Sequence, residues 1–179
     1  PQAEPDPVET ILQRLSLEEQ VGQLFFVRCP EEQALENLQT YHLGGYLLFG
    51  RDIQGKTANE LIQTIQHYQD AASLPLLIGV DEEGGSVVRV SANPHLRSEK
   101  FASPQRLYQL GGLDRILSDT REKDILLNAL GFNVNLAPVA DVSTDPGDFI
   151  YARAFGQDAA ATADYVSAVT GQMRADAIG

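Results

Sequence analysis

The sequence predicts an α/β fold with parallel strands, and three observations support this prediction. Four short apolar runs recur along the 179 residues, and each is followed by a segment whose apolar residues have helical spacing. The runs are nearly continuous rather than alternating, which is typical of strands covered on both faces. Polar side chains also follow several runs directly. This regular order favours a parallel sheet with right-handed crossovers.

The strands are expected where an apolar run is bounded by glycine or by turn residues. GQLFFVRC and GGYLLFG are the first two such runs, LPLLIGV is the third, and FNVNLAPVADV is the fourth. The expected strands therefore cover residues 22–29, 44–50, 74–80 and 132–142.

The helices are recognised by the residues at their ends. Asp6 and Pro7 suit the start of a first helix, and Thr57 with Glu60 three residues later forms a capping box. Gly131 is typical of a residue that ends a helix. We expect helices at residues 7–22 with a break near Ser16, 31–41, 57–73, 118–130 and 158–177. The stretch between the third strand and residue 118 is expected to be irregular.

Two parallel architectures compete for this pattern. A doubly wound sheet usually carries a glycine-rich phosphate loop after its first strand, whereas the first run here ends in Arg28-Cys29-Pro30. A (β/α)8 barrel instead distributes functional residues over the carboxyl ends of several strands. Arg51 and Asp52 follow the second run, Asp81 follows the third, and Asp141 lies at the end of the fourth. The sequence therefore favours the barrel.

A complete barrel needs about 250 residues and eight strand–helix units. We therefore expect the N-terminal half of a TIM-type (β/α)8 barrel, with about four βα units over residues 7–179 and truncation before a fifth strand. Residues 1–6 are expected to be a linker. The proline- and acid-rich start lacks Met and favours export after removal of an upstream signal, with a cytoplasmic location as the alternative.

The composition argues against several classes of partner. The net charge is −12, and nucleic acids or anionic membranes require a basic surface instead. No apolar run reaches the roughly 18 residues that a membrane-spanning helix needs. Cys29 is the single cysteine, and no Cys/His cluster with zinc-ligand spacing occurs. We expect no metal and no organic cofactor.

The segment LLIGVDEEGGSVVRV at residues 76–90 carries the candidate site. Asp81 stands at the tip of the third strand, two glycines permit a tight turn, and Arg89 returns toward the same edge. A carboxylate that accepts hydrogen bonds and a guanidinium that donates them suit a ligand with many hydroxyl groups. The alternative is a mutual Asp–Arg ion pair in a loop, and the residues alone leave the two readings open.

The same segment resembles the signature of family-3 glycoside hydrolases, V-D-x-E-G-G-x-V-x-R, in the bacterial β-N-acetylhexosaminidase branch. LEEQVGQLFF, GGYLLFGRDI, LGFNVNLAPVADV and YARAFGQD resemble further family segments in family order. The resemblance implies that Asp81 binds hydroxyls of the terminal sugar and that Arg89 and Arg153 line the same subsite. Asp141 is expected either to shape this pocket or to partner Arg153 or the backbone.

The resemblance also implies what these residues do not supply. The family continues with a fifth strand that reads roughly K-H-F-P-G, then an Asp-x-His acid/base dyad and an aspartate nucleophile, and none of these occurs here. We therefore expect no catalytic residue in this chain. His42, His67 and His95 lack the required context, and Glu82 and Glu83 are expected to be structural acids that pair with loop amides.

The function implied by the resemblance is a β-N-acetylhexosaminidase. Such an enzyme would release terminal non-reducing N-acetylglucosamine from cell-wall or chitin-type oligosaccharides by a retaining mechanism. One alternative is a non-catalytic glycan-binding or half-barrel module that pairs with a second half-barrel or with its own copy. Another is a family-3 β-glucosidase, although DEEGG favours the hexosaminidase branch.

Overall fold

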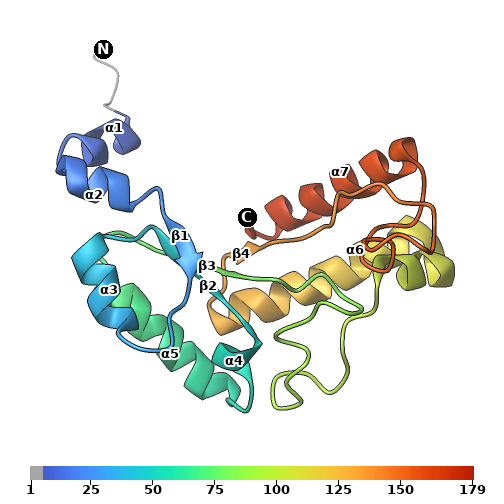
Figure 1. Cartoon of the computed structure of the whole chain (residues 1–179), viewed down its shortest axis with the longest axis horizontal. Helices are drawn as coiled ribbons and strands as arrows, with labels where there is room; N and C mark the ends of the chain where they lie inside the picture. Colours follow the sequence, from blue (N-terminus) through green and yellow to red (C-terminus); the bar gives the residue numbers. More distant parts are fainter. Residues whose placement is uncertain (1–5) are drawn as a thin grey trace.

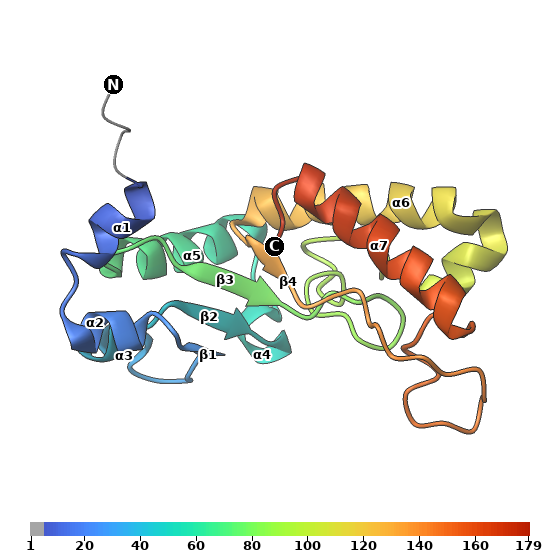
Figure 2. The ribbon, with the colours of Figure 1, turned by 90° about the horizontal axis from the view of Figure 1, so that it is seen from above.

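The computed structural model describes residues 6–179 and shows an α/β fold around one parallel sheet. The four strands lie in the order β1-β2-β3-β4, and all neighbouring pairs are parallel. The strands are β1 Phe26–Arg28, β2 Gly45–Leu48, β3 Leu77–Val80 and β4 Val134–Asn135. Figure 2 shows β1, β2 and β3 side by side and pointing in one direction. The predicted strand order and fold class are therefore confirmed.

The helices are α1 Pro7–Leu12, α2 Leu17–Gly22, α3 Ala34–Tyr41, α4 Gly50–Ile53, α5 Ala58–Ala71, α6 Pro104–Leu130 and α7 Ala159–Ala175. In Figure 1, α1, α2, α3 and α5 lie to the left of the strands, and α6 and α7 lie to the right. The break at Ser16 and the Thr57–Glu60 capping box are present as predicted. The predicted linker falls on residues 1–5, which lie outside the described residues, and on Asp6, which caps α1.

The fourth strand is much shorter than the predicted range of 132–142. Asparagine side chains replace part of its backbone ladder, because Ile78 N donates to Asn133 Oδ1 at 2.7 Å and Glu82 N donates to Asn135 Oδ1 at 3.0 Å. Leu136 N still donates to the carbonyl of Val80 at 2.9 Å. Pro138, which has no N–H, then follows, and the chain leaves the sheet.

The stretch before residue 118 is helical from Pro104 onward, so the prediction of an irregular segment there was wrong. Ser103 caps this helix by accepting a hydrogen bond from Arg106 N at 3.3 Å. Gly111 and Gly112 have non-helical dihedral angles and introduce a kink within α6. Two adjacent glycines disfavour a helix, which is why the periodic pattern was recognised only beyond them.

The strand register separates an outer face, covered by helices, from an inner face. Tyr46, Ile78, Leu48 and Val80 are fully buried on the outer face, where they meet the helices. On the inner face, Gly79 lies opposite Leu47, and a Cβ on Gly79 would overlap Cζ of Phe26. Leu77 and Leu136 on this face remain 48% and 46% exposed. Within residues 6–179, the inner face therefore has few covering partners.

The two edges of the sheet differ. Within the described range, β1 pairs with β2 only. At the other edge, Gly179 N donates to Asn133 O at 2.9 Å and Asn135 N donates to Gly179 O at 3.0 Å. These two hydrogen bonds have the pattern of a parallel strand pair. Gly179 therefore satisfies one N–H and one C=O group at the outer edge of β4.

The loop that follows β3 is held by the buried carboxylate of Glu82, whose exposed fraction is 0%. Its Oε2 accepts hydrogen bonds from Arg89 N and Val90 N, both at 2.7 Å, and its Oε1 accepts from Ser91 N at 3.3 Å and from the Ser91 hydroxyl. Phe101 N donates in turn to Ser91 Oγ at 3.2 Å. Glu82 therefore pairs with loop amides, as predicted.

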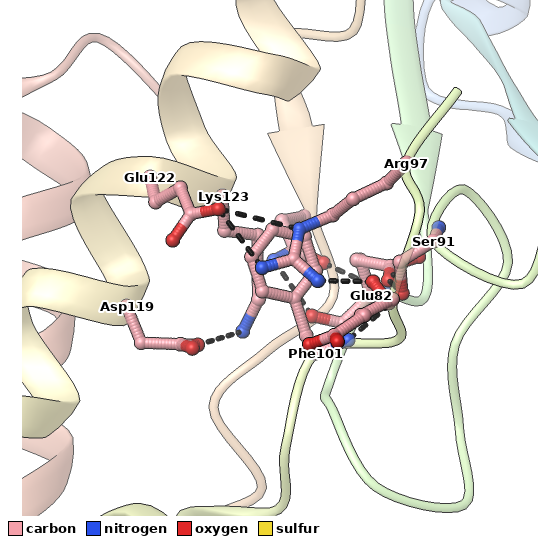
Figure 3. A network of polar contacts seen from close by, with 9 residues as sticks. Glu82, Ser91, Arg97, Phe101, Asp119, Glu122 and Lys123 are labelled. Carbon is pink, nitrogen blue, oxygen red and sulfur yellow. Dashed lines mark hydrogen bonds and ion pairs between the residues drawn. The ribbon is translucent and has the colours of Figure 1, made fainter. Parts of the chain in front are cut away.

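The same loop is fastened to α6 through an aromatic ring (Figure 3). The guanidinium of Arg97 lies 4.0 Å from the ring centroid of Phe101, and Lys123 Nζ lies 5.1 Å from it. Arg97 also donates to Glu122 at 2.9 Å, and Lys123 Nζ lies 3.6 Å from Asp119 Oδ2. Cations that share a ring and also meet carboxylates fix the loop against the helix.

A further buried acid, Asp124, lies on α6. Asp124 is completely buried, and neither of its carboxylate oxygens has a hydrogen-bond partner within the described residues. Burial, and then the charge of Asp176, raises the pKa of Asp124 from 3.8 to about 6. Burial thus favours the uncharged form more strongly in the folded than in the unfolded protein.

The open inner face and the β1 edge give a prediction for the isolated 179-residue chain. Unpaired strand edges and exposed apolar side chains favour association, because burial of that surface is what offsets chain entropy. We expect the chain to dimerise, aggregate or bind a complementary half-barrel in sedimentation experiments. A monodisperse monomer of 19.5 kDa would contradict this expectation.

Replacement of Glu82 by Ala should destabilise the protein by about 3 kcal/mol or more, because buried N–H groups then lose their acceptor. Hydrogen exchange should accelerate at Arg89, Val90 and Ser91. The exposed Glu36 on α3, changed to Ala, is the matched control and should change the unfolding free energy by less than about 0.5 kcal/mol. Equal effects of the two substitutions would contradict the proposed support of the loop.

The raised pKa of Asp124 predicts a pH-dependent stability. Because the folded pKa of about 6 exceeds the unfolded value of 3.8, this residue's contribution is fully present below pH 3.8 and is lost as the pH rises through 6. Asp124→Asn should therefore become more stable than wild type with rising pH, by at most about 3 kcal/mol. Urea unfolding at pH 4 and pH 7 measures the difference, and a difference independent of pH would contradict it.

Candidate functional site

The candidate site lies where the inner face meets the carboxyl ends of the strands. Asp81 is the first residue after β3, and alternation along the chain places it on the same face as Gly79. Arg89 Nη2 donates to Asp81 Oδ2 at 3.5 Å, and both side chains are partly buried. Arg89 Nε is buried and has no acceptor within the described residues. The contact between the pair is therefore long and leaves donor capacity unused.

Arg153, from the segment between β4 and α7, reaches the same region but has a different partner. Its Nε donates to Glu83 Oε2 at 2.9 Å and its Nη2 donates to Glu83 Oε1 at 2.6 Å. This two-fold contact raises the pKa of Arg153, and the charges of Asp141 and Asp81 add to the effect. Arg153 therefore lies within electrostatic reach of Asp81, while Glu83 holds its guanidinium in place.

The structure changes the expectations for Glu83 and Asp141. The side chain of Glu83 binds Arg153 and does not pair with loop amides, so that part of the prediction was wrong. Asp141 is exposed and makes no hydrogen bond or ion pair within residues 6–179. The two acids differ in burial, because Glu83 is buried beside the loop whereas Asp141 is exposed.

Arg28 and Phe49 also belong to this region, and sequence reasoning missed both as site residues. Phe49 follows β2, and its ring centroid lies 4.6 Å from the guanidinium carbon of Arg28 and 5.7 Å from that of Arg89. Arg28 is the last residue of β1. The strand register shows that these residues lie at the same edge of the sheet as Asp81. The sequence alone does not show this, because the three strands are distant from one another along the chain.

The other polar residues at the strand ends have structural partners. Arg51 donates to the carbonyl of Cys29 at 2.5 Å and to Glu31. Asp52 Oδ2 accepts from Phe49 N at 2.8 Å and so caps the short helix α4. These contacts close the loops after β1 and β2 and hold Phe49 in position.

The histidines do not join the site. His42 ends α3 beside the amino end of β2, and His67 and His95 are exposed on α5 and on the loop after β3. Across residues 6–179, no group of three His, Cys, Asp or Glu side chains is arranged to hold a metal ion. In that same range, no helix has the length and apolar character needed to cross a bilayer.

The chemistry available at this edge is recognition of hydrogen-bonding groups. Asp81 presents carboxylate oxygens as acceptors, Arg89 presents donors beside it, and Arg153 presents a guanidinium that Glu83 holds in place. Such a set can hold and orient a ligand rich in hydroxyl groups.

Comparison with known proteins identifies relatives of this chain. The profile of the glycosyl hydrolase family 3 N-terminal domain matches residues 16–178. A β-hexosaminidase of Mycobacterium tuberculosis, LpqI, is 29% identical over 174 residues, which cover 96% of this chain and 42% of the relative. Beta-hexosaminidase A of Pseudoalteromonas piscicida is 30% identical over 132 residues, 69% of this chain and 21% of the relative.

Solved structures agree with this relationship. A β-N-acetylhexosaminidase of Beutenbergia cavernae has a TM-score of 0.78 and 28% identity, and the match covers 92% of this chain and 52% of that structure. A family 3 β-N-acetylglucosaminidase of Paenibacillus shares the fold, with a TM-score of 0.81 and 24% identity over 92% of this chain and 32% of that structure. The chain thus spans less than half the length of LpqI. By the extent of the profile match, the chain belongs to the glycosyl hydrolase family 3 N-terminal domain family.

Proposed function

We propose that this chain forms the sugar-binding half of a β-N-acetylhexosaminidase that removes terminal non-reducing N-acetylglucosamine from cell-wall or chitin-type oligosaccharides. The observation that supports the proposal is the contact between Asp81 and Arg89 after β3 of a family 3 domain, with the charge of Asp81 also acting on Arg153. Relatives described as β-hexosaminidases support the choice of substrate.

In this proposal, the three side chains bind the sugar and do not break its glycosidic bond. Asp81 accepts hydrogen bonds from sugar hydroxyls, while Arg89 and Arg153 donate to ring substituents. Glu83 keeps Arg153 in one orientation through its two-fold contact. In a retaining mechanism, a carboxylate nucleophile and a separate acid/base group perform the chemistry. We assign both roles to residues other than these 179.

Two alternatives have specific support. A relative from Cellulomonas fimi that is 29% identical over 174 residues is described as a β-N-acetylglucosaminidase/β-glucosidase, so glucosides belong in the substrate test. The open inner face supports a half-barrel module that is completed by a second half-barrel or by its own copy. Both alternatives use the same binding edge.

We also propose that the protein is exported. A relative from Arthroderma benhamiae that is 25% identical over 137 residues is described as a secreted glycosyl hydrolase.

The direct test is Asp81→Ala in the full natural chain. Loss of a charge-assisted hydrogen bond should raise KM and lower kcat/KM for an aryl N-acetylglucosaminide by roughly tenfold to a hundredfold. Asp114→Ala, at an exposed position on α6, is the matched control and should leave both constants unchanged.

Two further activity measurements separate the alternatives. The 179-residue chain alone should not hydrolyse the glycoside above a mock preparation, because it lacks the two reacting groups. An aryl glucoside cleaved faster than the N-acetylglucosaminide would favour the β-glucosidase. Kinetics of Asp81→Ala equal to those of wild type would remove Asp81 from the site.

A further inference from the structure

A small polar cavity lies between α6, α7 and the segment that follows β4, and its volume is about 20 Å³. It is on the outer face of the sheet, because Asn135 lines it and pairs in register with Val80. Each polar residue of the lining is at most 8% exposed. These residues are Glu83, Asp119, Thr120, Lys123, Asn135 and Tyr165.

The charged groups on the α6 side of this cavity are incompletely paired. Lys123 Nζ and Asp119 Oδ2 point toward each other but lie 3.6 Å apart, which is longer than a hydrogen bond (Figure 3). Asp119 Oδ2 is buried and has no hydrogen-bond partner within residues 6–179. Burial raises the pKa of Asp119, and the charge of Lys123 opposes this effect. A further donor in the cavity would therefore stabilise the carboxylate.

Glu83 lines the same cavity while its carboxylate holds Arg153. Each carboxylate oxygen accepts one hydrogen bond from the guanidinium, at 2.9 Å and 2.6 Å, so each can accept another. Burial raises the pKa of the Tyr165 hydroxyl, and the charges of Glu83 and Asp119 add to this effect. Both carboxylates thus act on one hydroxyl of the lining, and the cavity connects the α6 pair with the contact that orients Arg153.

The size and the charge of the cavity select a water molecule as its occupant. One water needs about 10–15 Å³, so this cavity has room for one and is far too small for a sugar. The charges of Glu83 and Asp119 are balanced by those of Lys123 and Arg153, and an ion would add a buried charge without a partner. A water can donate to two carboxylates and accept from an ammonium group.

We propose that one ordered water occupies this cavity, where it accepts a hydrogen bond from Lys123 and donates to Asp119 and Glu83. Through this water, Asp119 and Lys123 are positioning residues for Glu83 and so for the guanidinium of Arg153. Neither residue touches the sugar. Their effect on sugar binding rests on the proposed function, whereas the water site does not.

A crystal structure of the full natural chain, at a resolution that shows ordered waters, tests the site independently of activity. Density for one water should lie about 2.7–3.2 Å from Asp119 Oδ2 and from an oxygen of Glu83. In Asp119→Leu, which removes the acceptor, this density should be absent and the contact between Glu83 and Arg153 should lengthen. A cavity without density in wild type would overturn the inference.

Kinetics of the full natural chain test the positioning role. Asp119→Leu should raise KM for an aryl N-acetylglucosaminide by roughly threefold to tenfold and change kcat by less than about twofold, because the lost support affects binding. Lys123→Met should raise KM in the same way. Asp119→Asn keeps an acceptor oxygen and should stay within about twofold of the wild-type KM. Asp114→Leu, at an exposed position on α6, is the matched control and should leave KM unchanged.

The outcomes separate this inference from the proposed function. An unchanged KM in Asp119→Leu and Lys123→Met, or an equal increase in Asp114→Leu, would overturn the positioning role. A loss of kcat at constant KM would do so as well. Wild type that cleaves no N-acetylglucosaminide would instead overturn the proposed function, and the density in the cavity would still decide whether the water is bound.

Discussion

The architecture of the site depends on one buried carboxylate. Glu82 follows Asp81 directly, but its side chain lies on the other side of the strand plane, among the amides of the returning loop. Because side chains of an extended chain alternate, anchoring Glu82 in the interior fixes Asp81 on the inner face. Glu83 then meets Arg153. Three consecutive acids, which would repel one another in a free strand, are thus separated into three environments.

The arginines are distributed in a corresponding way. Each is held by a different kind of partner: Arg28 by the ring of Phe49, Arg89 by Asp81, and Arg153 by Glu83. In a chain with a net charge of −12, this edge gathers guanidinium groups whose donors are only partly used. Such an arrangement suits a ligand that carries many acceptors, and a parallel sheet brings the partners together because all its strands end at the same edge.

The sequence predicted the strand order, the fold class and the meeting of Asp81 with Arg89, because strong apolar runs and capping signals are local. It could not predict partners that depend on register, so Glu83 was assigned to loop amides and Phe49 was overlooked. The early start of α6 was missed although Ser103 and Pro104 signal it, because Gly111 and Gly112 interrupt the pattern. The short β4 reflects side-chain hydrogen bonds, which no periodicity reveals.

The glycine below Asp81 on the inner face gives space to an aromatic ring from a strand that is not its neighbour. The ring of Phe26 extends from β1 toward β3 because Gly45, its register partner, presents no side chain and Gly79 leaves room for the tip of the ring. The ring thus crosses the inner face of β2 to reach β3. A methyl group added at Gly79 would lie 2.4 Å from Cζ of Phe26 and displace this ring, so a position without a side chain decides how an aromatic residue packs beneath Asp81.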